Sequence, residues 1–380
     1  MEPFDFELRT RLIFGAGTIG RLGPLARELG FRHPLLVADP GLVKAGHADR
    51  AVHELNRAGI AVTTFHDFDV NPDTAMIERA RDFAASLGVD SIVGLGGGSS
   101  MDCAKGTNFL LTNGGTMADY RGYGKASEPM LPMIAIPTTA GTGSEGQSYA
   151  VISDSTTHLK MACGDPKAAF RVAVLDPELT LSQPPPITAA AGFDAIAHAV
   201  ETSVTTRRNP VSDCLSREAW RLLSVNYARV MTHPDRLDAR EAMQLGSFYA
   251  GLAIEQSMLG AAHACANPLT ARYRTTHGMA LAILLPHIVR WNSATSPQLY
   301  LPLLLALNHL PSDGNTGERL ADWIVDLTAA AGLPSALRDV GVPEGDLPQL
   351  ADDAGKQWTA TFNPRPFGAS DALEVYQCAY

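Results

Sequence analysis

The sequence lacks any uninterrupted apolar run of the ~20 residues that a membrane-spanning helix needs. Its start, MEPFDFELRT, carries acidic residues where a signal peptide has a basic end and an apolar run. Cysteines are few: five in 380 residues, widely spaced and without a CxxC pair. This argues against both a disulfide framework and a structural zinc site. Together these absences predict a cytoplasmic protein with reduced thiols that does not cross a membrane.

Positive charge is also scarce, with 30 Lys and Arg against 40 Asp and Glu and a net charge of −10. A chain of this charge without a basic stripe repels polyanions, so nucleic acid is not an expected partner. Hydrophobic residues at 46% and charged residues at 18% are ordinary for a globular enzyme. Because 380 residues are too many for a single core, we expect two domains.

The first half of the chain alternates β-branched apolar runs with helical patterns. Helical patterns lie between most of the runs, notably at residues 74–87. This alternation predicts βαβ units with a parallel sheet, an architecture that binds nucleotides. The strand-like runs occupy residues 11–14, 34–38, 60–65, 91–95, 131–136, 148–152, 159–162 and 172–175.

The second half is helical almost throughout, and the run Pro184-Pro185-Pro186 marks the boundary. We therefore expect an α/β dinucleotide-binding domain over residues 1–185 and an all-α metal-binding and catalytic domain over residues 186–380. The end of the chain, from residue 334 to 380, is less periodic and contains several turn signals. The helical patterns occupy residues 189–204, 210–230, 237–258, 278–291, 299–307 and 317–331.

Two glycine motifs compete for the phosphates of a dinucleotide. The segment from Gly15 to Gly20 matches GxGxxG literally, and Asp39 ends the next predicted strand, about 20 residues on, as the fingerprint requires. However, the helix that it should open contains Gly20, Gly23 and Pro24, a poor start for a helix that must hold a pyrophosphate. We therefore interpret the first motif as a tight turn.

The second glycine motif, GLGGGSSMDCAK, runs from Gly94 to Lys105 after the most apolar strand of this half. Its consecutive glycines let a ligand approach the backbone, and Ser99 is expected to cap the helix that begins there. Amides at such a helix start suit a pyrophosphate, although a glycine-rich turn without a ligand is the alternative. The polar stretch PTTAGTGSE, from Pro137 to Glu145, follows another apolar strand. The two loops should meet at the carboxyl edge of the sheet.

A candidate metal site begins with Asp194 and His198. They lie four residues apart in an Ala-rich segment without proline, so a helix would place both on one face. His263 and His277 follow downstream. One carboxylate and three imidazoles can hold a divalent transition metal with room for substrate. A single His is more often a surface or core residue, but Asp194 would otherwise be an acid in an apolar helix without a partner.

Together these motifs resemble the iron-containing alcohol dehydrogenase family, the metal-dependent branch of the dehydroquinate-synthase-like fold. The resemblance implies an N-terminal α/β nucleotide domain, a C-terminal helical domain and an active site between them. The motifs that carry it are, in chain order, the Gly15/Gly17 turn, Gly96 to Asp102, Pro137 to Glu145, Gly192 to Glu201, His263, His277-Gly278, Leu284-Leu285-Pro286 and Asn363-Pro364-Arg365-Pro366.

The resemblance also implies roles for individual residues. Fe(II) is the favoured metal and Zn(II) is possible, with Asp194, His198, His263 and His277 as ligands. A carboxylate at Asp39 would accept the adenosine ribose hydroxyls and repel the extra phosphate of NADP, so NAD is favoured. The residues implied to bind the cofactor are Asp39, Gly97, Gly98, Ser99, Asp102, Thr138, Thr139, Ser144 and Lys160.

The sequence departs from the family pattern at two positions beyond the third ligand. The family usually has a second histidine four residues after that ligand, near the nicotinamide, where this chain has Asn267. An amide can hydrogen-bond but cannot titrate, so a proton would need another route. A glycine that usually follows is replaced by Thr270. These changes bear on substrate and turnover and leave the metal ligands intact.

The expected function is NAD-linked, metal-dependent oxidation of a small primary alcohol or reduction of the aldehyde. The metal would polarise the substrate oxygen, and hydride would pass to or from nicotinamide. Arg272 and Arg274 suggest an anionic tail on the substrate as an option. The alternatives are a cyclase or lyase of the dehydroquinate synthase type and a non-catalytic NAD-binding protein. The resemblance implies a homodimer or larger homo-oligomer.

Overall fold

The computed structural model describes residues 3–157, 159–308 and 315–380. The chain divides into two compact units: Glu7–Gln183, here the α/β unit, and Pro184–Tyr380 together with the chain's first residues up to Phe6, here the helical unit. The predicted fold class, a parallel-sheet α/β domain followed by a helical one, is confirmed.

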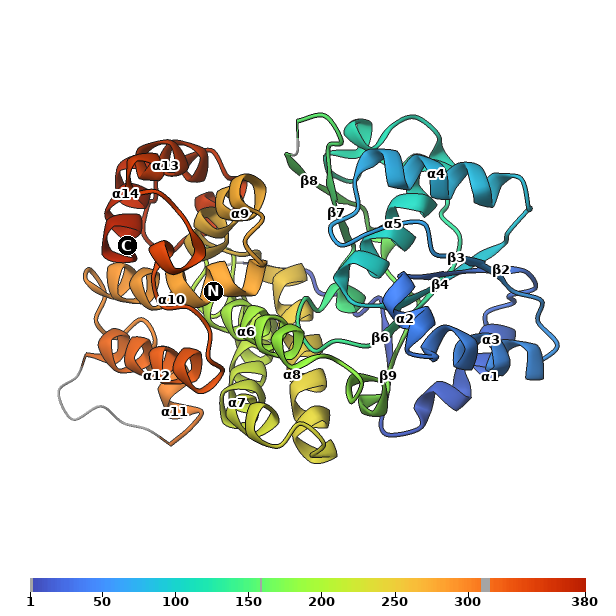
Figure 1. Cartoon of the computed structure of the whole chain (residues 1–380), viewed down its shortest axis with the longest axis horizontal. Coiled ribbons are helices and arrows are strands. Elements are labelled where there is room, and N and C mark those ends of the chain that lie inside the picture. Colours follow the sequence, from blue (N-terminus) through green and yellow to red (C-terminus); the bar gives the residue numbers. More distant parts are fainter. Residues whose placement is uncertain (1–2, 158, 309–314) are drawn as a thin grey trace. The chain divides into compact units, whose positions relative to one another are not determined.

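The α/β unit is built on a six-stranded sheet in which every pair of neighbours is parallel (Figure 1). The four inner strands are buried along their whole length, as their continuous apolar runs require when helices cover both faces. In sheet order the strands are β1 (Arg11–Phe14), β9 (Val172–Leu175), β6 (Met133–Pro137), β4 (Ser91–Gly96), β2 (Pro34–Ala38) and β3 (Thr63–Phe65).

Helices cover both faces of this sheet (Figure 1). On one face, α1 (Leu22–Glu28) and α3 (His47–Arg57) bury their apolar residues in a core shared with the strands. On the other, α5 (Gly98–Asn113) lies on β4 and β2 and packs against α4 (Thr74–Ala85). Since α5 follows β4 directly, its N-terminus lies at the carboxyl edge of the sheet, where open α/β sheets bind ligands.

A second sheet of three strands belongs to the same unit, in the order β5 (Gly122–Tyr123), β8 (Lys160–Gly164) and β7 (Tyr149–Ser153). Strands β7 and β8 pair antiparallel, and β7 packs against α5. The unit is completed by α2 (Pro40–Lys44) and the 3₁₀ turns η1 (Thr18–Arg21), η2 (Met117–Tyr120), η3 (Ser144–Gly146), η4 (Pro166–Ala168) and η5 (Pro177–Thr180).

The helical unit is organised around α6 (Pro185–Thr202), which packs against α7 (Pro210–Thr232), α8 (Leu237–Ser257) and α10 (His277–Ser293). From Thr188 to its end α6 is buried apart from one position, which its alanine-rich sequence permits. The remaining elements are α9 (Ala261–Tyr273), α11 (Leu301–Leu305), α12 (Thr316–Ala330), η6 (Leu337–Val340), η7 (Glu344–Asp346), α13 (Leu347–Gly355), η8 (Trp358–Phe362) and α14 (Ala369–Cys378).

Several helices of the structure were not predicted from the sequence. The interior of α9 contains Pro268, which usually ends a helix, so the pattern did not predict it. Helices α13 and α14 are short and pack against each other at the end of the chain, where the sequence indicated turns. The predicted helices of the helical unit all form, with ends that differ by a few residues.

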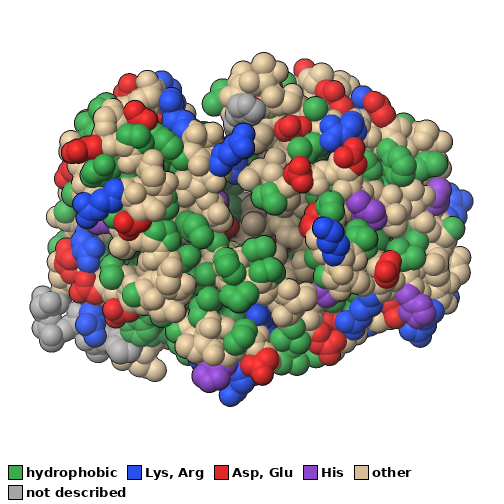
Figure 2. Space-filling model, viewed as in Figure 1, with side chains coloured by type: hydrophobic (Ala, Val, Ile, Leu, Met, Phe, Trp, Pro, Cys, Tyr) green, Lys and Arg blue, Asp and Glu red, His purple; other side chains and the backbone are tan. Residues whose placement is uncertain are grey.

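Charges are interspersed on the surface. On the face shown in Figure 2, Lys and Arg side chains alternate with Asp and Glu and form no broad patch of one sign. Across the described residues, no helix has the length and apolarity needed to cross a bilayer.

Candidate metal centre and cofactor site

Helix α6 supplies a carboxylate and an imidazole from one face. Asp194 and His198 are both buried, and His198 Nε2 lies 3.2 Å from Asp194 Oδ1. Glu201, one further turn along the same face, is buried as well. The i, i+4, i+7 spacing of the three residues therefore places three polar side chains inside an otherwise apolar helix environment.

The imidazoles of two other helices meet the same carboxylate. His263, in the first turn of α9, has Nε2 3.5 Å from Asp194 Oδ1. His277, the first residue of α10, has Nε2 4.0 Å from that oxygen. The potential ligand atoms of Asp194, His263 and His277 all lie within 4.8 Å of one another. His198 does not join this three-residue group, but it stacks on His263 with ring centroids 4.9 Å apart.

Close packing of α10 on α6 makes this convergence possible. A Cβ atom at Gly278 would lie 1.9 Å from the backbone oxygen of Ala190. Only glycine therefore lets the first turn of α10 approach α6 so closely, and this approach brings His277 to Asp194. The His277-Gly278 pair thus works as a unit, in which one residue presents the imidazole and the other provides the space.

The residues present suit a cation. Asp194 Oδ1 and His263 Nε2 are buried, and neither makes a hydrogen bond within the described residues. The Nδ1 atom of His263 bonds the carboxylate of Glu201, which can only accept, so the ring proton is on Nδ1. The lone pair of Nε2 therefore faces a carboxylate oxygen. Two buried acceptors this close need a metal ion or a proton between them.

Burial and the neighbouring charges shift the pKa values of His263 and Asp194 in opposite directions. Burial alone would lower the pKa of His263, but Glu201 and Asp194 outweigh it and raise this pKa to about 9. Burial alone would raise the pKa of Asp194, but the neighbouring imidazoles, His198 first among them, hold it far below its usual range. These shifts favour a proton in the cluster when no metal is bound, and such a proton must leave when a metal binds.

The two departures from the family pattern both lie on α9. Asn267 is half-buried, and its Nδ2 donates to Oε1 of Gln357 at 3.2 Å. Thr270 Oγ1 lies 3.3 Å from Nδ1 of His277. Two residues further, Arg272 is paired with Asp353, with nitrogen-to-oxygen distances of 2.9 and 2.5 Å. The charge of Arg272 is therefore already compensated within the helical unit.

In the α/β unit, the two predicted cofactor loops lie side by side at the carboxyl edge of the sheet. The Thr138 amide donates to the Gly96 oxygen at 3.0 Å. Cβ atoms at Gly97 and Gly98 would lie 3.2 Å from Thr139 and 2.7 Å from Thr142. A Cβ at Gly98 would therefore force a shift of the loop contact, and one at Gly97 would crowd it. Helix α5 begins at Gly98 without a side-chain cap, so its first amides suit a phosphate.

The expectation that Ser99 caps α5 was wrong, because the N-cap is Gly97. Instead, Ser99 Oγ accepts a hydrogen bond from the amide of Asn71 at 3.1 Å. Lys160 Nζ donates to Oδ1 of the same Asn71 at 3.2 Å. Asn71 has φ of 56°, a conformation that asparagine tolerates better than most residues. The structure therefore joins two predicted cofactor residues through a third that the sequence did not indicate.

Beneath the loops lies a buried ionic cluster. Lys105 Nζ donates to the oxygen and Oγ of Ser144 and to the oxygen of Tyr149, at 2.7 to 2.9 Å. Ser144 Oγ lies 3.4 Å from Asp102 Oδ1. Burial raises the pKa of Asp102 to about 6, against the lowering effect of Lys105. Lys105 therefore holds Ser144 and the start of β7 against α5, a role that the sequence analysis missed.

Asp39 follows β2 and caps α2, with Oδ1 accepting from the amides of Gly41 and Leu42 at 2.8 and 3.3 Å. The literal GxGxxG turn is different, because its amides are already used. Gly17 and Ile19 each donate to the buried carboxylate of Asp176 at 3.0 Å. An internal anion thus occupies the position that a phosphate would need, in agreement with the interpretation as a tight turn.

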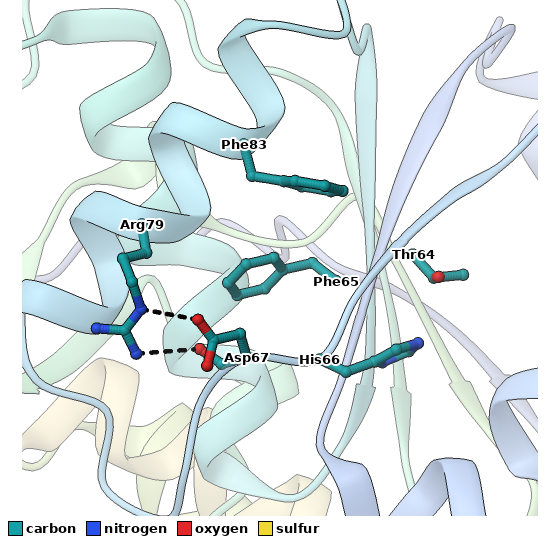
Figure 3. A pocket seen from close by; sticks show the side chains of 6 residues that line it. All are labelled: Thr64, Phe65, His66, Asp67, Arg79 and Phe83. Carbon is teal, nitrogen blue, oxygen red and sulfur yellow. Dashed lines mark hydrogen bonds and ion pairs between the residues drawn. The ribbon is translucent and has the colours of Figure 1, made fainter.

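A pocket of about 610 Å³ lies elsewhere in the α/β unit, at the edge strand β3. Figure 3 shows the Phe65 and Phe83 rings lining it beside the ion pair of Asp67 and Arg79. None of the predicted metal or cofactor residues lines this pocket. It is therefore separate from the site described above.

Comparisons with known proteins cover both units. Residues 9–177 match the family described as iron-containing alcohol dehydrogenase, and residues 188–380 match its C-terminal domain. The chain is 36% identical to alcohol dehydrogenase 4 of Schizosaccharomyces pombe, over 96% of this chain and 86% of that one. It is 30% identical to NAD-dependent methanol dehydrogenase of Bacillus methanolicus, over 99% of each.

Among solved structures, 1,3-propanediol oxidoreductase is similar over 100% of both chains, with a TM-score of 0.95 and 33% identity. The agreement extends from the sheet of the α/β unit to the last helix. With both family domains matched in order and relatives above 30% identity over nearly the full length, the chain belongs to the iron-containing alcohol dehydrogenase family.

Proposed function

We propose that this alcohol dehydrogenase interconverts a small, neutral primary alcohol and its aldehyde, with NAD and one divalent metal ion, Fe(II) being favoured and Zn(II) an alternative. The observation that carries the proposal is the convergence of Asp194, His263 and His277, with two buried acceptor atoms that lack a donor among the residues the structure describes. Family membership favours a dehydrogenase over a cyclase of the dehydroquinate synthase type.

We assign the metal to Asp194, His198, His263 and His277 in the helical unit. When bound there, such an ion acts as a Lewis acid towards an alcohol or carbonyl oxygen. Asp194 supplies the negative charge, and its burial among imidazoles keeps water from competing for its oxygens. Asn267 cannot exchange a proton, so we propose that the substrate proton leaves through water or the cofactor ribose.

We assign the cofactor to the α/β unit. The uncapped start of α5 at Gly97, Gly98 and Ser99 would hold the pyrophosphate, and Thr138, Thr139 and Ser144 line the neighbouring loop. Lys160, held near Ser99 by Asn71, would reach a ribose. Asp39 disfavours the additional phosphate of NADP, and one relative is named as NAD-dependent. Asp102 supports Ser144 from below.

A neutral substrate is supported by the helical unit. Arg272 is already paired with Asp353, so one of the two charges that suggested an anionic tail is compensated. The names of two relatives point the same way, since methanol and 1,3-propanediol are small neutral alcohols. We therefore favour short neutral alcohols over acids such as semialdehydes.

We also propose a cytoplasmic homodimer or larger homo-oligomer. The five cysteines are free thiols, as expected for a reducing compartment. Phe4, Phe6 and Leu8 alternate with acidic residues near the start of the chain and expose 40 to 56% of their surface. Such alternation suits pairing with a second extended chain, and light scattering of the purified protein would measure the assembly.

The proposed activity is tested by NADH consumption with a series of short aldehydes, using protein loaded with Fe(II) or Zn(II). We expect turnover that a chelator abolishes and metal restores. The substitution Asp194→Asn should lower kcat at least about a thousandfold, because it removes the only anionic ligand. Binding of NAD without any turnover would instead support the non-catalytic alternative.

A further inference from the structure

We propose that Glu201 and Thr270 are positioning residues that set the ring orientation and tautomer of two metal ligands, His263 and His277, and that they do so with unequal strength. The inference rests on the proposed metal site, because a fixed Nδ1 proton matters only if Nε2 binds a metal. Partners of this kind commonly decide how well a histidine binds its metal.

Glu201 acts on His263 through a carboxylate. Its Oε2 accepts the Nδ1 proton of His263, and both side chains are at least 95% buried. Because a buried carboxylate is a strong acceptor, it fixes the proton on Nδ1 and increases the basicity of Nε2. The lone pair of Nε2 is thereby aimed at Asp194.

The second oxygen of Glu201 holds the backbone that carries His263. Oε1 accepts from the amide of Ala262 at 2.6 Å, in the first turn of α9. A Cβ at Gly260 would lie 3.1 Å from this oxygen, so the preceding glycine lets the carboxylate approach closely. One side chain of α6 thus fixes both the helix start and the imidazole of α9 relative to Asp194.

Thr270 acts on His277 through a hydroxyl. Its Oγ1 lies 3.2 Å from the oxygen of Ala266, one turn earlier in α9, and 3.3 Å from Nδ1 of His277. A threonine hydroxyl in a helix donates its only proton to such a carbonyl and keeps a lone pair as acceptor. His277 then donates from Nδ1, which leaves Nε2 for the metal.

The two interactions differ in strength. The contact with Glu201 involves a charged, buried acceptor, whereas the contact with Thr270 is neutral, longer and made to a His277 side chain that is 25% exposed. Charge-assisted hydrogen bonds are roughly twice as strong as neutral ones. Loss of Glu201 should therefore weaken metal binding more than loss of the Thr270 hydroxyl.

The test is Co(II) binding to the metal-stripped full chain, measured by calorimetry and by the ligand-field absorption of the bound ion. The variants are Glu201→Gln, Thr270→Val, which removes the hydroxyl at similar volume, and Thr270→Ser, which retains it. We expect Glu201→Gln to raise Kd about 10- to 100-fold and Thr270→Val to raise it less, with Thr270→Ser close to wild type.

Imidazole nitrogen NMR adds a measurement that a purely structural role would not change. We expect the wild type to show an Nδ1–H signal of His263 and Glu201→Gln to lose it. Binding within twofold of wild type for both Glu201→Gln and Thr270→Val would overturn the inference. So would a lower melting temperature of Glu201→Gln without a change in Kd, because Glu201 would then only cap α9.

The proposed metal site has its own control. Wild-type protein should bind one Co(II), and Asp194→Asn should abolish this binding. If the wild type binds no Co(II), or Asp194→Asn binds it unchanged, the metal site fails and the inference fails with it. If the wild type binds Co(II), Asp194→Asn abolishes binding, and the Glu201 and Thr270 variants bind with unchanged Kd, the metal site stands and the inference alone is overturned.

Discussion

Asn267 Nδ2 donates a hydrogen bond to Oε1 of Gln357, the residue that precedes η8, at 3.2 Å. The amide therefore ties α9 to the segment after α13, at the position where the family usually has a histidine. Gln357 Nε2 in turn reaches the oxygen of Asp353 at 3.5 Å. Asn267 thus has a structural partner that does not depend on substrate. Position 267 itself carries no titratable group.

We predict that Asn267→His adds a pH dependence to catalysis that the amide of Asn267 cannot supply. An imidazole with a pKa of ~6.5 could protonate the oxygen of an aldehyde during reduction, so kcat for reduction should rise about tenfold or more as the pH falls through this value. Alcohol oxidation should show the opposite slope. The measurement is a pH profile of kcat in both directions.

The control for this variant is Asn267→Gln, which keeps an amide and cannot titrate. Its pH profile should have the shape of the wild-type profile even if its rate is lower. If Asn267→Gln and Asn267→His show the same profile, position 267 does not contact the path of the proton.

A glycine-to-alanine substitution in each of the two glycine motifs tests which of them binds the cofactor. A Cβ at Gly98 would lie 2.7 Å from Thr142, whereas a Cβ at Gly20 would meet nothing within 4 Å. We predict that Gly98→Ala raises KM for NAD roughly tenfold or more, because the loop that holds the pyrophosphate must shift. Gly20→Ala should leave KM unchanged, since Asp176 already fills the first turn. Equal effects would contradict our choice of motif.

The parts that the sequence could predict are those governed by local periodicity. Asp194 and His198 share a helix face because they are four residues apart, and that relationship needs no knowledge of the fold. The partner of Glu201 is 62 positions away, and the carboxylate that fills the Gly17 turn is 159 positions away. No spacing rule relates residues so distant, because their contact depends on how helices and strands pack.

Helix α9 shows why some elements escape prediction even locally. Pro268 lies in its interior, and proline there removes a backbone hydrogen bond. Tertiary contacts offset this loss, since the first turn of α9 is held by Glu201 and by Asn363, whose Oδ1 lies 3.3 Å from the amide of Ala261. Both partners come from other parts of the chain, so the local sequence did not contain the information.

Selectivity between NAD and NADP should depend on the charge of Asp39. The Asp39→Asn variant keeps an oxygen that can accept from Gly41 and Leu42, so the cap of α2 should survive. Its neutral side chain no longer repels the extra phosphate, and the ratio of kcat/KM for NADP to that for NAD should rise about tenfold. Asp49→Asn, which removes the same charge from the exposed surface of α3, should leave the ratio unchanged.

Glu145 should make the α/β unit less stable as the pH rises. Burial raises its pKa from an ordinary 4.5 to about 7, and Lys105 only partly opposes this shift. Between these values the folded protein keeps a proton that the unfolded chain has lost, so raising the pH favours unfolding. This stabilisation is complete below pH 4.5, is lost as the pH rises through about 7, and amounts to at most about 3 kcal/mol.

The Glu145→Gln variant removes this titration. We predict that the melting temperature of the wild type falls more steeply than that of Glu145→Gln between about pH 5 and pH 8, by calorimetry in one buffer series. Glu128→Gln, an exposed carboxyl group in the same unit, should behave like the wild type. If the melting temperatures of Glu145→Gln and wild type fall in parallel with pH, Glu145 is ionised in the folded protein. Its charge in η3 would then be compensated by Lys105 in α5.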